Sequence, residues 1–301
     1  MTKARRELAA LMPSQDVLIE VLDARTPASS ANPVIAELRG ARPCIRILTR
    51  SDLADPALTS AWQRHLAAAP GVIAFAASTR DSAAIRRNVA DALRRLGLVA
   101  APGRSIRALI AGIPNVGKST LINVLMDRTV AKVGDKPAVT TVQQRVVLPS
   151  GTVLTDSPGL MWPKIEDEQV GFRLALAGAI PDTALDHVVL ARHGCELLGR
   201  RYPELLRRRF GLAELGATGD ATLEAIGRRR GCLGAGGAID LYKAAALVIH
   251  ELRSGTIGRI TLDEPPPAAA ASSPSADEPP RPDEPAPPRS DEPPRSDEPP
   301  P

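Results

Sequence analysis

The sequence predicts an α/β fold followed by a smaller helical domain, and three observations support this prediction. In the first 160 residues, short apolar runs alternate with segments of helical periodicity, as in a sheet covered by helices. After residue 166 the strand-like runs disappear, and Leu/Ala/Arg-rich segments continue to residue 262. Residues 263–301 are rich in Pro and repeat the tripeptide DEP. We therefore predict three parts, at 1–165, 166–262 and 263–301, the last a disordered acidic tail.

The apolar runs mark the expected strands, and the periodic segments between them mark the expected helices. Strands are predicted at 16–23, 43–49, 71–76 and 106–111. Helices are predicted at 33–39, 56–68 and 81–96. A hairpin is predicted from 142–148 and 152–155, which flank the turn residues PSG at 149–151.

Composition and charge exclude several classes of protein. No apolar run reaches the ~18 residues of a transmembrane helix, and the charged N-terminus lacks a secretory signal. Cys44, Cys195 and Cys232 form no CxxC pair, which excludes a zinc ribbon and indicates a reducing cytoplasm. Residues 263–301 hold ten acidic residues and three arginines, a net charge of −7. The preceding residues therefore carry +11 within a chain of net charge +4, which favours a polyanionic partner.

The strongest functional signal is GIPNVGKS at 112–119, a complete GxxxxGK[ST] between an expected strand and an apolar helix. Its glycines let backbone N–H groups surround phosphate oxygens. Lys118 supplies a charge to the β- and γ-phosphates, and the Ser119 hydroxyl is suited to Mg²⁺. The motif predicts a nucleotide-binding segment made of Asn115, Val116, Gly117, Lys118, Ser119 and Thr120.

Two further segments complete the predicted phosphate chemistry. DSPG at 156–159 ends an expected strand, where Asp156 is suited to hold Mg²⁺ through water and the Gly159 N–H to meet a γ-phosphate. The polar loop GDKPAVTT at 134–141 places the Thr140 hydroxyl where it can add to the Mg²⁺ shell. Lys118, Thr140 and Gly159 are therefore the candidate catalytic residues.

Recognition of the base is predicted from elements that come earlier in the chain. The string ILTRSD at 47–52 closes an apolar strand with TxxD in place of NKxD, so Thr49, Arg50 and Asp52 are candidates. The Asp52 carboxylate is able to accept hydrogen bonds from both N1–H and N2–H₂ of guanine, a pair of donors that adenine lacks. The next strand ends near Ala77, where we expect a backbone N–H to contact the guanine carbonyl.

With these motifs in place, the sequence resembles the circularly permuted GTPases, and more narrowly the ribosome biogenesis GTPase A family. The similarity covers nearly all of residues 1–264. It lies in VLDARTPASSANP at 21–33, DSPGLMWPK at 156–164, GCLGAGGAID at 231–240 and GTIGRITLDE at 255–264. The resemblance implies a permuted P-loop domain that binds GTP and GDP and hydrolyses GTP with Mg²⁺. It further implies K⁺ binding at Asn115.

The family resemblance also implies a cellular role and partners. We expect a cytoplasmic monomer that acts in late maturation of the large (50S) ribosomal subunit and binds its rRNA and proteins. Arginine clusters at 200–201, 207–209 and 228–230 are candidates for contacts with RNA phosphates.

Several positions depart from the common GTPase patterns. Thr49 and Arg50 replace Asn and Lys, Ala138 replaces a Gly, and Leu160 stands where many GTPases carry a water-positioning Gln. Members of the family also begin with a WFPGH segment whose His is implicated in hydrolysis. Residues 1–6 resemble the family's residues just after that His, and none of the four histidines stands in its place, so we expect slow hydrolysis.

Three alternative functions stay open on the sequence alone. The chain is also compatible with a GTP-binding, ribosome-associated module of negligible intrinsic hydrolysis. The second alternative is a permuted GTPase of the small-subunit type, and the third is an ATP-dependent enzyme that shares only the P-loop. Single-turnover hydrolysis with and without ribosomal subunits distinguishes the first alternative, and nucleotide competition distinguishes the last.

Overall fold

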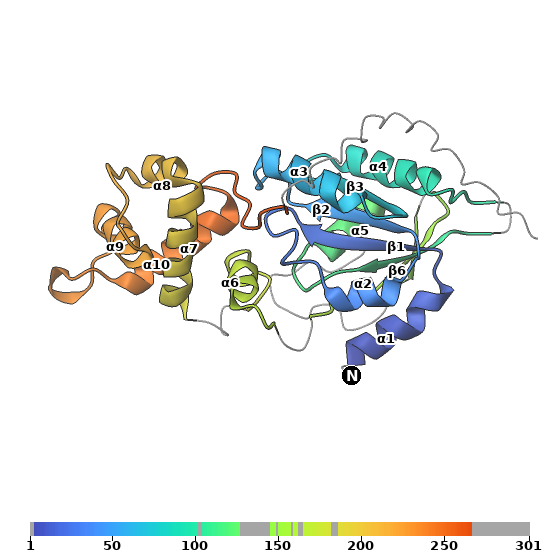
Figure 1. Ribbon diagram of the computed structural model, residues 1–301, viewed down its shortest axis with the longest axis horizontal. Helices are drawn as coiled ribbons and strands as arrows, with labels where there is room; N and C mark the ends of the chain where they lie inside the picture. The colour runs from blue at the N-terminus through green and yellow to red at the C-terminus, as the bar shows by residue number, and fades with distance from the viewer. Residues whose placement is uncertain are drawn as a thin grey trace, which may run out of the picture. The chain divides into compact units, whose positions relative to one another are not determined.

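A six-stranded sheet organises the first half of the chain in the computed structural model (Figure 1). The structure describes residues 3–101, 104–126, 145–148, 150–157, 159–161, 165–181 and 186–266. The strands are β1 (Val17–Asp23), β2 (Cys44–Thr49), β3 (Val72–Ala76), β4 (Arg107–Ala111), β5 (Arg145–Val147) and β6 (Val153–Asp156). Their order is β3-β2-β1-β4-β6-β5, with every pair parallel except β5–β6. The predicted strands and α/β class are confirmed, while residues 142–144 of the predicted hairpin lie outside the described residues.

Helices cover both faces of this sheet. They are α1 (Lys3–Leu11), α2 (Pro33–Arg39), α3 (Pro56–Ala67), α4 (Ser82–Arg95) and α5 (Lys118–Met126). All seven residues of β1 are buried because side chains that alternate along the strand meet helices on either side. Ile19 packs in one cluster with residues of α4 and α5, whereas Leu18 packs in another with Leu8 of α1 and Ile35 of α2. The three helices predicted from periodicity are confirmed, and α1 is an additional element.

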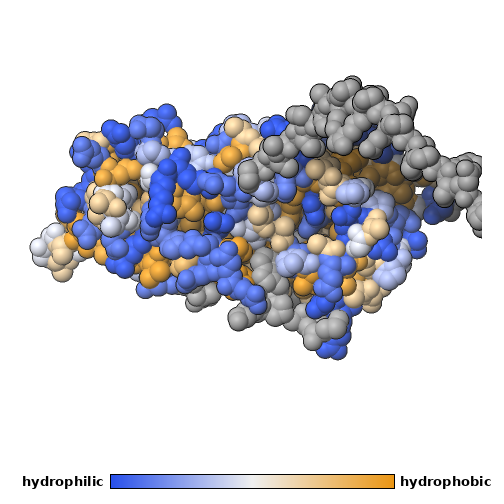
Figure 2. All heavy atoms as spheres, in the orientation of Figure 1, coloured by the Kyte–Doolittle hydropathy of each residue, from blue (hydrophilic) through white to orange (hydrophobic). Residues whose placement is uncertain are grey.

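The remainder of the described chain is helical. It contains α6 (Glu168–Leu176), α7 (His187–Arg201), α8 (Pro203–Phe210), α9 (Gly219–Arg229) and α10 (Leu241–Ser254). Figure 1 shows α7 to α10 gathered in one bundle, and Leu190, Phe210, Ile226 and Val248 share its core. Hydrophilic side chains cover much of the bundle surface seen in Figure 2, with smaller hydrophobic areas between them. No β-strand follows Asp156 among the residues that the structure describes, as the sequence predicts.

The end of the folded chain differs from the predicted boundary. Residues 1–266 form one compact unit, and the predicted division of this unit after residue 165 stays a prediction. Asp263, the first residue of the predicted tail, is only 1% exposed, and its carboxylate accepts hydrogen bonds from the Ser29 N–H and hydroxyl, both at 2.7 Å. Because this buried carboxylate is hydrogen-bonded within the fold, the predicted start of the tail at residue 263 is wrong. Residues 267–301 lie outside the described residues.

Among the helices that the structure describes, none combines the length and the apolar character that a membrane span requires.

Candidate nucleotide-binding site

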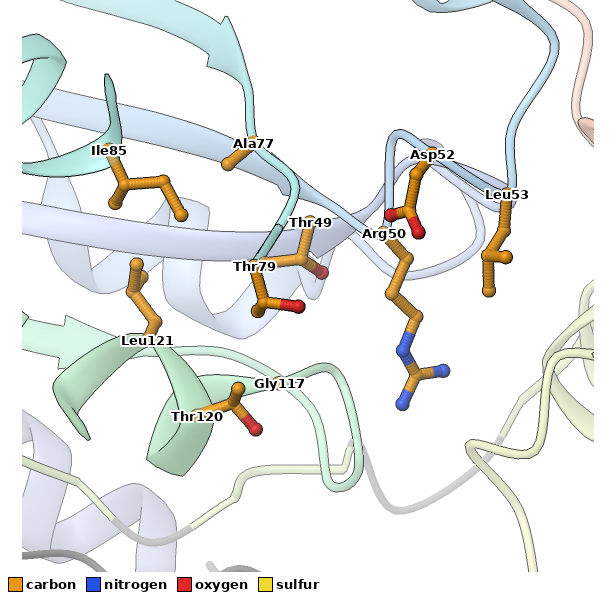
Figure 3. A pocket seen from close by; sticks show the side chains of 10 residues that line it. All are labelled: Thr49, Arg50, Asp52, Leu53, Ala77, Thr79, Ile85, Gly117, Thr120 and Leu121. Carbon is orange, nitrogen blue, oxygen red and sulfur yellow. The ribbon is translucent and has the colours of Figure 1, made fainter. Parts of the chain in front are cut away.

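A cleft of about 250 Å³ lies at the carboxyl ends of the parallel strands (Figure 3). In open α/β sheets, ligands bind at this edge, where the strand order reverses, which here is between β1 and β4. The cleft is lined by Thr49, Arg50, Asp52, Leu53, Ala77, Thr79, Ile85, Gly117, Thr120 and Leu121. The segments after β2 and β3 therefore share one cavity with the loop and helix that follow β4.

The cleft joins candidates from both halves of the predicted site. Asp52 and Ala77, from the predicted base-reading segments, line it together with Gly117 and Thr120 of the predicted phosphate-binding segment. Thr49 and Arg50 line it as well. Figure 3 shows Thr49, Thr79 and Thr120 between Asp52 on one side and the apolar Ile85 and Leu121 on the other.

Four lining residues are not among those that the sequence predicts. Leu53, Ile85 and Leu121 are apolar, and their spacing along the chain is the same as that of ordinary core residues, so no signal distinguishes them. Thr79 has a usable signal, since it lies two residues beyond Ala77 at the end of the same strand.

The loop between β4 and α5 adopts the conformation that its sequence requires. Gly117 has a φ of +103°, and Asn115 has a φ of +58°, a left-handed conformation that Asn tolerates better than most residues. A Cβ atom at Gly112 would stand 2.6 Å from the backbone oxygen of Val21, so the close approach of β1 and this loop requires Gly. The Asn115 amide Nδ2 donates to the backbone oxygen of Gly178 at 3.3 Å, and its contact with K⁺ stays a prediction.

Thr49 and Arg50 link the end of β2 to this loop. The Thr49 hydroxyl lies 2.7 Å from the backbone oxygen of Val116, and Arg50 Nη2 donates to the backbone oxygen of Asn115 at 2.8 Å. Arg50 Nη1 also pairs with the buried Asp23 carboxylate at 3.2 Å. Burial raises the pKa of Asp23, but two guanidinium groups, one of them Arg50, outweigh burial and hold that pKa below its usual value. The residues that depart from the NKxD pattern thus connect two edges of the cleft.

Asp52 and Ala77 differ in how their polar groups are engaged. The Asp52 carboxylate, which is partly buried, lies 3.2 Å from Nε of the exposed Arg80 side chain. The Ala77 N–H donates to the backbone oxygen of Leu48 at 2.8 Å, so this particular amide extends the β2–β3 ladder. If a backbone N–H reads the guanine carbonyl, the amide must come from a neighbouring residue such as Ser78.

Lys118 and Asp156 form the charged floor of the predicted phosphate site. Lys118 Nζ, at the start of α5, donates to the backbone oxygens of Gly112 at 3.1 Å and Ile113 at 2.8 Å. Burial lowers the pKa of Lys118 to about 8, although the Asp156 charge opposes this shift. Burial likewise raises the pKa of Asp156 to about 6, against the opposing effect of Lys118.

A divalent cation fits this arrangement. Asp156 is 2% exposed, and its Oδ1 atom has no hydrogen-bond partner among the described residues. A buried, unpartnered carboxylate oxygen is costly unless it finds a ligand, and Mg²⁺ or its bound water is such a ligand. Ser119 directly follows Lys118 in α5, whereas Thr140 lies outside the described residues.

The segment after DSPG is anchored to the same loop. A Cβ atom at Gly159 would stand 3.1 Å from the backbone of Pro114 and 3.2 Å from Lys118 Nζ, so Gly lets the two segments approach closely. The Leu160 N–H donates to the backbone oxygen of Gly112 at 3.2 Å, and the Leu160 oxygen accepts from Asn32 Nδ2 at 2.7 Å. The Leu160 side chain is buried in the core, so it anchors this segment and does not orient water.

Comparisons with known proteins identify relatives of the whole chain. The protein family described as 50S ribosome-binding GTPase matches residues 107–205. Ribosome biogenesis GTPase A of Bacillus pumilus is 39% identical over 272 residues, which cover 88% of this chain and 96% of that protein. The protein of the same name from Bacillus cereus is 41% identical, with 88% of this chain and 92% of the relative covered.

Solved structures are similar in fold. A GDP-bound structure of YlqF is 25% identical with a TM-score of 0.61, and covers 86% of this chain and 99% of its own. GNP-bound YlqF from T. maritima is also 25% identical, with a TM-score of 0.60 and coverage of 87% and 98%. With a P-loop, a matching GTPase fold and relatives that align over nearly their whole length, the chain belongs to the ribosome biogenesis GTPase A family and is a GTPase.

Proposed function

We propose that this GTPase reads guanine with Asp52 and acts in late maturation of the large ribosomal subunit. The observation that carries the first half is the single cleft lined by Asp52 and Ala77 on one side and by Gly117 and Thr120 on the other. The name of the relatives, ribosome biogenesis GTPase A, and the description of the matching family support the second half. Because the base-reading turn precedes the P-loop in the sequence, we infer a circularly permuted GTPase domain.

The phosphate end of the proposed site rests on the buried charges. We assign Mg²⁺ to the hydroxyls of Ser119 and Thr140 and, through water, to Asp156, whose Oδ1 has no partner among the described residues. When bound, Mg²⁺ neutralises charge on the β- and γ-phosphates. Lys118 adds a second positive charge, and the Gly159 N–H donates to the γ-phosphate.

For contact with ribosomal RNA, the arginines of the helical part fall into two groups. The first group is engaged within the fold. Arg209 and Arg230 both pair with the buried Glu251 carboxylate, and Arg201 donates to the backbone oxygen of Leu262 at 2.8 Å. The second group is exposed and comprises Arg207 and Arg208 on α8 with Arg228 and Arg229 on α9. Of these, Arg207 also forms an exposed ion pair with Glu204 at 3.0 Å. We propose that the exposed group contacts RNA phosphates.

Replacing Arg207 and Arg208 with Ala together is expected to weaken binding of the GTP-bound protein to large ribosomal subunits. Each lost phosphate contact reduces the slope of log affinity against log salt by about 0.7–0.9, so two contacts reduce it by about 1.4–1.8. Co-sedimentation with purified subunits across a salt series measures both quantities. GTP affinity without subunits should not change, because neither arginine lines the cleft.

Arg94 and Arg95 provide a matched control for this experiment. They are two exposed arginines on α4, and their replacement with Ala removes the same charge from the sheet-bearing half of the chain. A control pair that loses as much binding as the α8 pair would contradict the proposed surface. Equal binding to small subunits would contradict the assignment to the large subunit.

A further inference from the structure

The turn that carries Asp52 is in contact with the segment that follows the last helix. We call residues 50–55 the guanine-reading turn and residues 255–263 the C-terminal strap. The turn begins with Arg50 at a φ of +56°, closes with a hydrogen bond from the Leu53 N–H to the Arg50 oxygen at 2.9 Å, and ends at the N-cap of α3, Asp55. Other carbonyl groups of the turn find their partners in the strap.

Two neighbouring residues of the strap donate hydrogen bonds to three of these carbonyl groups. Arg259 Nη2 donates to the backbone oxygen of Ser51 at 2.9 Å, and Arg259 Nε donates to that of Ala54, also at 2.9 Å. The Ile260 N–H donates to the backbone oxygen of Leu53 at 2.9 Å. The guanidinium group therefore bridges the two sides of the turn, directly around Asp52.

The strap itself is fixed by contacts that do not involve Arg259. Ile260 and Leu262 are buried, and the Leu262 N–H donates to the backbone oxygen of Arg25 at 2.6 Å. Asp263 holds the far end through its two hydrogen bonds to Ser29. A Cβ atom at Gly255 would stand 2.8 Å from the Leu53 side chain, so the near end of the strap also lies against the turn. Arg259 thus reaches the turn from an anchored backbone.

We propose that Arg259 is a positioning residue for guanine recognition, which holds the turn in the conformation that presents the Asp52 carboxylate to the base. A guanidinium group suits this task because its donors are planar and fixed relative to one another, so two carbonyl contacts set the width of the turn. The hydrogen bonds that one carboxylate accepts from both N1–H and N2–H₂ are sensitive to small displacements. A preorganised turn keeps both of these hydrogen bonds in place. This inference rests on the proposed reading of guanine by Asp52.

The test compares GDP with IDP, because hypoxanthine keeps the N1–H and the ring carbonyl of guanine but lacks the N2 amine. In the parent chain, a well-placed Asp52 gains from the second donor, so GDP binds more tightly than IDP. Arg259→Ala is expected to weaken GDP binding about five- to tenfold and to reduce the GDP-to-IDP affinity ratio towards one. Arg259→Lys keeps one of the two carbonyl contacts, so its GDP-to-IDP affinity ratio should lie between those of the parent and of Arg259→Ala. Isothermal titration with each nucleotide measures the ratio.

A second readout follows the contact between the turn and the strap itself, by comparing hydrogen exchange of the Ile260 amide with and without GDP in each protein. GDP binding should slow hydrogen exchange of the Ile260 amide in the parent, because the carbonyl that accepts this N–H belongs to the ordered turn. In Arg259→Ala this slowing should be lost. Arg95→Ala, an exposed arginine replacement on α4, should leave both the nucleotide ratio and the protection of Ile260 at parental values.

The outcomes separate this inference from the function on which it rests. If the parent binds ADP with the same affinity as GDP, both the reading of guanine by Asp52 and the role of Arg259 are overturned. If the parent prefers GDP but Arg259→Ala weakens the binding of GDP and of IDP by the same factor, only the role of Arg259 is overturned. Unchanged Ile260 exchange on GDP binding would also overturn it, since the turn and the strap would then be uncoupled.

Discussion

Lys118→Met is expected to lower GTP hydrolysis at saturating nucleotide by about 10²- to 10³-fold or more. Phosphoryl transfer depends mainly on positioning the reactants and on neutralising charge around the γ-phosphate. A positive charge held in a fixed position beside this phosphate therefore accounts for a large part of the rate enhancement. The Lys118 side chain is only 8% exposed, and hydrogen bonds to two backbone oxygens fix its orientation. Its ammonium group is therefore in place before nucleotide binds. Methionine keeps much of the length and apolar stem without the charge. Single-turnover hydrolysis measures the loss.

The control for this variant is Lys243→Met on α10, a lysine that pairs with Asp240 at 3.3 Å and lies outside the cleft. Its rate should equal that of the parent. Thermal unfolding of both variants shows whether the folded population is the same. A Lys118→Met protein that hydrolyses GTP at the parental rate would mean that the chemistry does not use this charge.

Asp52→Asn is expected to weaken GTP binding by on the order of 2–3 kcal/mol, about 30- to 150-fold, and to improve binding of xanthosine triphosphate. The carboxylate accepts both donors of the guanine edge, whereas an amide presents one acceptor and one donor group. Xanthine carries a carbonyl where guanine carries its N2 amine, so the amide suits it better. Equilibrium titration with the two triphosphates measures the exchange of preference.

Asp91→Asn on α4 is the matched control, since it makes the same chemical change at an exposed carboxylate. The Arg80–Asp52 ion pair is lost in Asp52→Asn but not in the control. Because the Arg80 side chain is exposed, we expect the loss of this pair to change the stability of the fold only slightly. A variant that binds GTP as tightly as the parent would remove Asp52 from the site.

The sheet was predictable from the sequence because its parallel strands are uninterrupted runs of apolar residues. Each of β1 to β4 begins one residue after its predicted start and ends at the predicted residue. Because these strands are buried on both faces of the sheet, polar and apolar residues do not alternate along them, and turn residues in the sequence mark where each strand ends. Helix α1 was not predicted, because Lys3–Leu11 has no acidic residue in its first turn and no basic residue in its last.

The nucleotide motifs were predictable because each is a short string at a strand end, and parallel strands bring these ends to one edge. The supporting contacts were not, because they join residues that are distant in the sequence. Arg259 and Ser51 are 208 residues apart, and Asp263 and Ser29 are 234 apart. Arg209 likewise pairs with Glu251, a residue distant in the sequence. Because of this pairing, one arginine of the cluster predicted to contact RNA is engaged within the fold. Local periodicity carries no information about such partners.

Displacement of a fluorescent guanine nucleotide from the parent chain tests the central claim most directly, since the claim is that one cleft holds both the base and the phosphates. GTP and ATP are titrated as competitors at the same Mg²⁺ concentration. The assignment of Asp52 and the P-loop to one guanine site predicts that GTP displaces the probe at a concentration at least about 100-fold lower than ATP. Equal displacing concentrations of GTP and ATP would contradict it.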